Sequence, residues 1–235
     1  MTASRRSRGF VTISPSSPAC PNDKAGEDEA MIMTGLAFGT LYVTPVETAA
    51  DCQKTAQAFA APEQTHARHR RHLHQANLTR ELLEMVDTPL ILFMEHDTPI
   101  DQTLGMIPWA DIVELMSGAH LDVLRFHHEG AIHPEHEHLM IDHVTEEMVR
   151  VPVRRTVQWS QRPHVARTDY YRRILTEHFP PNCSTMIEDK MHSVAQSEPY
   201  ERNRIAIYHP DGNIRRSLHL DGRRDAPKFD MRFGT

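Results

Sequence analysis

The stretch LILFMEHDTP, residues 90–99 of this 235-residue sequence, decides the fold. Five consecutive apolar residues predict a strand that is buried on both faces, and the Pro-bearing turn after the acids ends it. In an open α/β sheet, ligands bind in the crevice outside the carboxyl ends of the strands. Hard divalent cations prefer carboxylate oxygens and often hold substrate phosphates at the same time. Glu95 and Asp97 are therefore candidate ligands for Mn²⁺ or Mg²⁺.

A second acidic pair, Glu188-Asp189, follows Ile187 about ninety residues further along, and His219 lies beyond it. In this order the motifs resemble those of GT-A-fold glycosyltransferases of the family-two type. In that family a DxD-type motif closes a buried strand and binds the metal and diphosphate of a nucleotide sugar, and an xED motif follows. Residues 95–97 are similar to the first motif, with Glu in place of the first Asp. The resemblance covers roughly residues 75–222.

The resemblance implies an α/β fold with a GT-A-like, Rossmann-like mixed and mostly parallel sheet flanked by helices. We expect a single domain over residues 1–235, with a mobile loop at about 15–30 and a C-terminal tail at about 222–235. The implied activity is metal-dependent transfer of a sugar from a nucleotide diphosphate sugar, most simply a UDP-sugar, to an acceptor hydroxyl. An inverting displacement is implied, with Asp189 as general base and Glu188 beside it. Glu95, Asp97 and His219 are the implied metal ligands.

Further residues are candidates for binding the two substrates. Side chains predicted to approach the nucleotide or its phosphates are Asn77, Arg80, Arg162, Arg215, Arg216 and Arg223. Trp159 offers a ring for stacking on the acceptor, and Gln158 and Gln161 offer fixed hydrogen-bond donors.

Each of these features also has a structural explanation. Solvated acids are common at strand ends, and the dipole of a helix favours carboxylates such as Glu188 and Asp189 in its first turn. The segment 66–80 could be an exposed basic helix face, and Trp159 could be a core residue.

Composition narrows the class of protein. Residues 1–150 carry 11 Lys/Arg against 22 Asp/Glu, whereas residues 151–235 carry 15 against 10, so the second part is suited to an anionic ligand. The resemblance to phage-type base glucosyltransferases makes a hydroxymethylated base in DNA one acceptor, although a net charge of −6 counts against DNA affinity. A glycan is the other acceptor class. Three scattered cysteines and no apolar run of membrane-spanning length predict a cytoplasmic protein without a membrane partner, in the host cytoplasm if phage-encoded.

Six histidines lie between His127 and His143, interleaved with carboxylates. Imidazole and carboxylate are ligands of zinc and iron, so a metallohydrolase built on residues 127–143 is a rival hypothesis. A non-catalytic module that binds nucleotide sugars is a third. The P-loop, the Gly-x-Gly-x-x-Gly fingerprint and the Gly-x-Ser-x-Gly elbow are absent from the sequence, which disfavours kinases, Rossmann oxidoreductases and serine hydrolases.

Periodicity predicts the remaining elements. A strand at 36–44 and a helix at 47–60 suggest a βαβ beginning. Further strands are expected at 9–14, 121–126, 151–157 and 204–208, and further helices at 78–86, 106–116, 168–175 and from 187.

Overall fold

The computed structural model describes residues 12–13, 32–35, 39–58, 74–95, 97–103, 105–141, 150–181, 183–210, 212 and 214–218. The helices are α1 (Ala49–Ala58), α2 (Gln75–Glu84), α3 (Trp109–Ser117), α4 (Thr168–His178) and α5 (Ile187–Ser197). The strands are β1 (Thr12–Ile13), β2 (Ile32–Gly35), β3 (Gly39–Val46), β4 (Leu90–Glu95), β5 (Val123–Phe126), β6 (Met140–Ile141), β7 (Val153–Thr156), β8 (His164–Arg167) and β9 (Ile205–Tyr208). Among the described residues, 3₁₀ turns span Pro134–Leu139 and Tyr200–Arg202.

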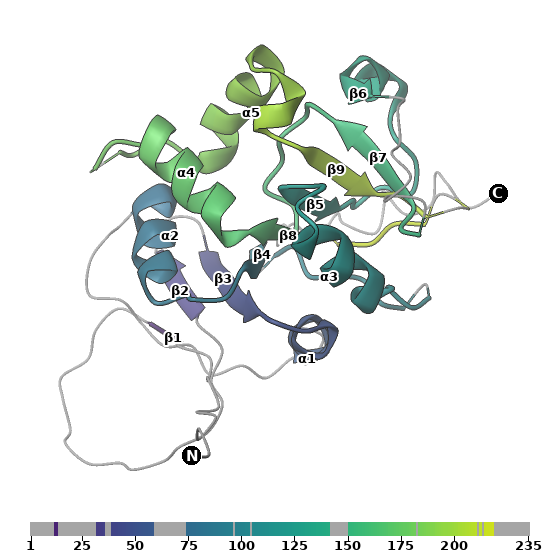
Figure 1. Cartoon of the computed structure of the whole chain (residues 1–235), viewed down its shortest axis with the longest axis horizontal. Coiled ribbons are helices and arrows are strands. Elements are labelled where there is room, and N and C mark those ends of the chain that lie inside the picture. Colours follow the sequence, from purple (N-terminus) through teal and green to yellow (C-terminus); the bar gives the residue numbers. More distant parts are fainter. Residues whose placement is uncertain are drawn as a thin grey trace, which may run out of the picture.

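Three layers result, with the sheet in the middle (Figure 1). The strand β4 shows why. Its side chains alternate between two apolar clusters, Ile91 and Phe93 in one and Leu92 and Met94 in the other, and each of these four is at most 1% exposed. The first cluster packs against α2, α4 and α5, and the second against α1 and α3. The expectation that the LILFM run is buried on both faces is confirmed.

The sheet has the order β1-β2-β3-β4-β8-β5-β9-β7-β6 in the part of the chain that the structure describes. Of its eight pairings, only β1–β2 and β5–β9 are parallel, so the expected mostly parallel sheet is wrong. Two of the antiparallel pairings are made by β8, which lies between β4 and β5. The strands β4, β5 and β9 nevertheless run in one direction.

Most predicted elements are present with shifted ends. The β3 strand continues through Pro45, which pairs with Ile91, and β3 is antiparallel to β4, so the expected βαβ beginning is wrong. The short strands β2, β6 and β8 were not predicted. The predicted loop at 15–30 and the tail at 222–235 lie outside the described residues. None of the helices in the described part of the chain has the length and apolarity to cross a membrane.

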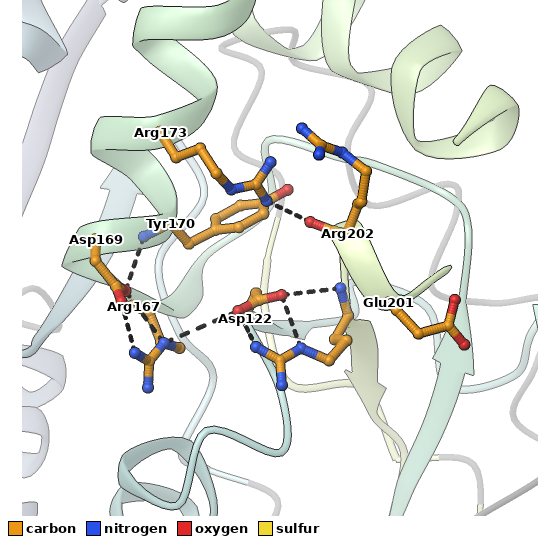
Figure 2. Close-up of a pocket in the computed structure, with 8 residues that line it drawn as sticks. Asp122, Arg167, Asp169, Tyr170, Arg173, Glu201 and Arg202 are labelled. Carbon is orange, nitrogen blue, oxygen red and sulfur yellow. Dashed lines mark hydrogen bonds and ion pairs between the residues drawn. The ribbon is translucent and has the colours of Figure 1, made fainter. Parts of the chain in front are cut away.

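A pocket of about 430 Å³ lies at the edge of the sheet where β8 ends and α4 begins (Figure 2). Because Leu90 pairs with Arg167 while Phe93 pairs with His164, this edge is opposite to Glu95. The pocket is lined by Asp122, Arg167, Asp169, Tyr170, Arg173, Glu201, Arg202 and Arg204. Asp122, only 5% exposed, accepts hydrogen bonds from Arg204 Nε at 3.0 Å and Nη2 at 2.8 Å and from the Arg204 amide at 3.1 Å. The charges of Asp122 and Arg204 neutralise each other, and the hydrogen bonds between the two residues link the starts of β5 and β9.

Replacing Asp122 with Asn should therefore lower the free energy of unfolding by about 2 kcal/mol, since a buried charged acceptor is lost and Arg204 keeps its charge. Chemical denaturation measures this. Glu177→Gln is the control, because Glu177 pairs with Arg173 and Arg202 at the exposed surface, where such pairs contribute less than about 1 kcal/mol. Equal losses in the two variants would contradict a special role for Asp122.

Candidate functional site

The shared direction of β4, β5 and β9 brings their carboxyl ends to one edge of the sheet. The antiparallel β8 contributes its opposite end to the same edge, preceded by Gln161 and Arg162. The residues that follow the three strands are Asp97 after β4, His127 and Glu129 after β5, and His209 after β9. The sheet thus gathers polar side chains from four segments that are distant in sequence.

The acidic end of β4 is linked to the start of α5 through the side chain of Gln75. Gln75, the first residue of α2, donates from Nε2 to Glu95 Oε1 at 2.8 Å. Its Oε1 accepts from the Ile187 amide at 2.9 Å. Ile187 is the first residue of α5, and Glu188 follows it. The two predicted acidic motifs therefore meet through one amide side chain.

Glu95 is held in an environment that favours its neutral form. Burial, followed by the negative charges of Asp97 and Glu188, raises the pKa of this carboxyl to about 8, against the opposing effects of the Gln75 hydrogen bond and Arg162. A carboxyl with this pKa is largely protonated at neutral pH. A nearby cation would reverse the preference.

Arg162 lies among the carboxylates. Burial lowers the pKa of its guanidinium, while Glu188, Asp97, Glu129 and Glu95 act in the opposite direction. Its backbone is fixed from the core, because the Arg162 carbonyl lies 2.6 Å from His164 Nδ1. That acceptor requires Nδ1 to carry the proton, so Nε2 accepts from the Tyr171 hydroxyl, also at 2.6 Å. Burial and the charge of Arg125 keep His164 neutral, with a pKa of about 4.

A second cation, Arg125, lies inside the sheet on β5 and is only 2% exposed. It donates to Gln158 Oε1 at 2.6 Å, and its Nε is buried without a hydrogen-bond partner. Burial lowers its pKa to about 10, and the charge of Glu188 counteracts that shift. Burial likewise lowers the pKa of His127 to about 4, with smaller contributions from Arg125, Arg162 and His209. The site thus brings two arginines close to several carboxylates.

The C-terminal segment 214–218 crosses the same edge. The amides of Arg216 and Ser217 donate to the His127 carbonyl at 2.8 and 3.0 Å, and the Leu218 amide donates to Pro99 at 2.9 Å. Arg215 Nε donates to Asp101 at 3.1 Å, and Arg216, 3% exposed, donates to the Gly105 carbonyl at 2.8 Å. Both predicted phosphate ligands are thus near the site but engaged in holding this segment.

Asn77 and Arg80 face the loop that leads into α5. Asn77 Nδ2 donates to the Cys183 carbonyl at 3.2 Å, and Arg80 donates to the carbonyls of Leu175 at 3.0 Å and Phe179 at 2.5 Å. These bonds give both side chains a structural role, and a nucleotide would have to compete with them.

The predicted acceptor residues are more buried than expected. Trp159 is 2% exposed and stacks on Tyr170 with ring centroids 6.0 Å apart, so the prediction that its ring is available to a ligand is wrong. Gln158 accepts from Arg125. Gln161 is 4% exposed, and both of its amide atoms are buried without a hydrogen-bond partner.

Asp189 is exposed one residue beyond Glu188, and His219 and Arg223 lie outside the described residues. Across the described ranges, no three His, Cys, Asp or Glu side chains are arranged as a metal ligand set. That holds for the described histidines between 127 and 138 as well, and His143 lies outside the described ranges. The rival zinc or iron centre therefore has no support from this part of the chain.

Sequence reasoning missed Gln75, Arg125 and His209 as site residues. Arg125 carried a signal, because an arginine between Leu124 and Phe126 in a buried strand needs a charged or polar partner. Gln75 carried none, since its two partners are distant in sequence. Compared with protein-family models, curated proteins and solved structures, the chain shows no significant match.

The raised pKa of Glu95 predicts a pH-dependent effect of Glu95→Gln. The unfolded chain loses this proton near pH 4.5 and the folded protein near pH 8, so the stability that Glu95 contributes at low pH is lost as pH rises through that window. In metal-free buffer we expect the variant to gain stability relative to the parent between pH 5 and pH 9, by about 4 kcal/mol, since the two pKa values lie more than three units apart and one unit equals about 1.4 kcal/mol. Urea denaturation at several pH values measures this. Parallel pH profiles for the two proteins would refute the assigned shift.

Proposed function

We propose that this chain is a metal-dependent glycosyltransferase that moves a sugar from a nucleotide diphosphate sugar to an acceptor hydroxyl. A UDP-sugar is the favoured donor. The observation that carries the proposal is the meeting of Glu95 and Asp97 with Glu188 at one sheet edge, with Gln75 bonded to both segments. The resemblance in motif order predicts that the two acidic segments lie close together. An acidic strand end with a purely structural role predicts no such proximity.

The donor set fits a hard divalent cation. Mn²⁺ and Mg²⁺ are commonly held by one or two protein carboxylates together with substrate phosphates, so Glu95 and Asp97 suffice without a complete protein cage. Bound there, the ion would offset negative charge on the departing nucleoside diphosphate. His219 is a further candidate ligand.

In this proposal, residues of the chain bind the phosphates and act as the general base. The pKa of Arg162 is influenced by four nearby carboxylates, and its guanidinium is suited to contact the phosphates, which bidentate guanidinium groups bind well. The buried cation Arg125 interacts electrostatically with Glu188. Asp189, exposed beside Glu188, takes the acceptor proton as general base, and the attack inverts the anomeric centre.

The acceptor is the least constrained part of the proposal. A hydroxymethylated base in DNA and a glycan hydroxyl both fit the required chemistry. The described site is rich in carboxylates, which repel a phosphate backbone, so we favour a glycan.

Asp189→Asn should still bind the nucleotide but lose transfer by about a hundredfold or more, because a general base typically contributes 10²–10⁴ in rate. Single-turnover transfer from a radiolabelled UDP-sugar with Mn²⁺ measures the rate, and calorimetry with UDP measures binding. Glu188→Gln is the matched comparison. Full turnover in the Asp189 variant with loss in the Glu188 variant would move the base to Glu188.

Removal of metal provides an independent check. Treatment with EDTA should abolish donor hydrolysis and transfer, and Mn²⁺ or Mg²⁺ should restore both, because carboxylate oxygens select hard cations. Restoration only by zinc, with no nucleotide affinity, would support the rival hydrolase. Nucleotide affinity without turnover on any DNA or glycan acceptor would support a binding module.

A further inference from the structure

The contacts of Gln75 are unusual for a residue at the start of a helix. It is 7% exposed, and both ends of its side-chain amide are used, by Glu95 at 2.8 Å and by the Ile187 amide at 2.9 Å. Because a backbone N–H can only donate, the oxygen of the amide must face Ile187 and the NH₂ group must face Glu95.

The bond to Ile187 fills a gap at the start of α5. The first N–H groups of a helix have no partner within the helix, and a side chain at the N-cap usually accepts from one of them. Here the N-cap is Met186, whose side chain makes no capping hydrogen bond. Gln75 supplies the missing acceptor from a different helix.

The bond to Glu95 constrains the other motif. A buried carboxyl with a fixed donor on Oε1 has one oxygen oriented and the other left for a further partner. A side-chain amide can donate to a carboxyl through its NH₂ group and accept from an N–H through its oxygen at once. Glutamate would lose the donor, and leucine would lose both bonds.

The helix that carries Gln75 is itself firmly held. Arg80 donates to carbonyls at the end of α4, and Arg172 of α4 donates back to the Leu83 carbonyl at 2.9 Å. Leu82 and Leu83 are 0% and 2% exposed in the core. Gln75 is therefore mounted on a rigid element.

We infer that Gln75 is a positioning residue that fixes the distance between the cation-binding end of β4 and the general-base segment at the start of α5. The inference rests on the proposed function for its catalytic consequence, while the physical link can be tested without it. Gln75 itself touches neither substrate nor reacting atoms. Its effect passes through Glu95 on one side and through the Ile187 amide on the other.

The first test measures the link in the ligand-free protein. Hydrogen–deuterium exchange of the Ile187 amide should accelerate about tenfold or more in Gln75→Leu, because the amide loses its acceptor. Gln75→Glu keeps an acceptor oxygen and should exchange as the parent does. Thr88→Val is the control, since it removes a buried hydrogen bond, Oγ1 to the Leu90 carbonyl at 2.9 Å, at the opposite end of β4. Unchanged exchange in Gln75→Leu would overturn the inference.

The second test measures turnover and nucleotide binding. Both Gln75 variants should lose about 10- to 100-fold in kcat, as other residues that orient ligands of a metal site do, while the affinity for UDP at saturating Mn²⁺ stays within about threefold. Thr88→Val should keep the parent kcat. Faster exchange with an unchanged kcat would overturn the positioning role.

The two proposals fail in different ways. A parent protein that neither binds nucleotides nor transfers sugar would refute the proposed function. The link is then judged by exchange alone: loss of Ile187 protection in Gln75→Leu supports it, and retained protection overturns it.

Discussion

The burial of β4 on both faces is the constraint on which the rest of this structure depends. Four of its side chains, from Ile91 to Met94, are at most 1% exposed between two apolar clusters, so the strand cannot shift its register without exposing one set. Glu95 is therefore carried to the rim of the core, where it is mostly desolvated. The raised pKa of this carboxyl follows from its position at the end of an apolar strand.

The antiparallel insertion of β8 determines which residues meet Glu95. If β5 paired directly with β4, the segment at 161–162 would not reach this edge. With β8 between them, its amino end lies beside the carboxyl ends of β4 and β5, and Arg162 is placed among four carboxylates. The buried His164–Tyr171 pair then fixes the Arg162 backbone, which links the cation to the hydrophobic core.

Elements whose formation depends on local sequence patterns were predicted correctly. The LILFM run, the helices near 168 and 187 and the strand at 205–208 follow from apolar periodicity and β-branched composition. Strand direction was wrong because parallel and antiparallel neighbours of a fully buried strand have the same composition, and β8 is a four-residue strand beside a proline. Trp159 was placed in a ligand site because flanking glutamines gave a polar context, whereas its neighbours in space are Tyr170 and Tyr171.

The sequence analysis named the acidic residues of the candidate site but not the residue that connects them. Glu95, Asp97 and Glu188 were named because carboxylates beside apolar runs can be recognised from the sequence alone. Gln75 makes its two bonds to residues 20 and 112 positions away, and no local pattern encodes such a pair.

Charge balance explains why the proposed site would take its cation and its nucleotide together. With Glu95 protonated, the charges of Asp97, Glu129 and Glu188 are nearly offset by Arg162 and Arg125. A divalent cation alone is favoured only if Glu95 releases its proton, which burial opposes. A diphosphate alone would meet the carboxylates at close range without a cation between them. Binding both at once lets Glu95 ionise against the cation while the phosphates meet the cation and Arg162, so each partner removes the electrostatic penalty of the other.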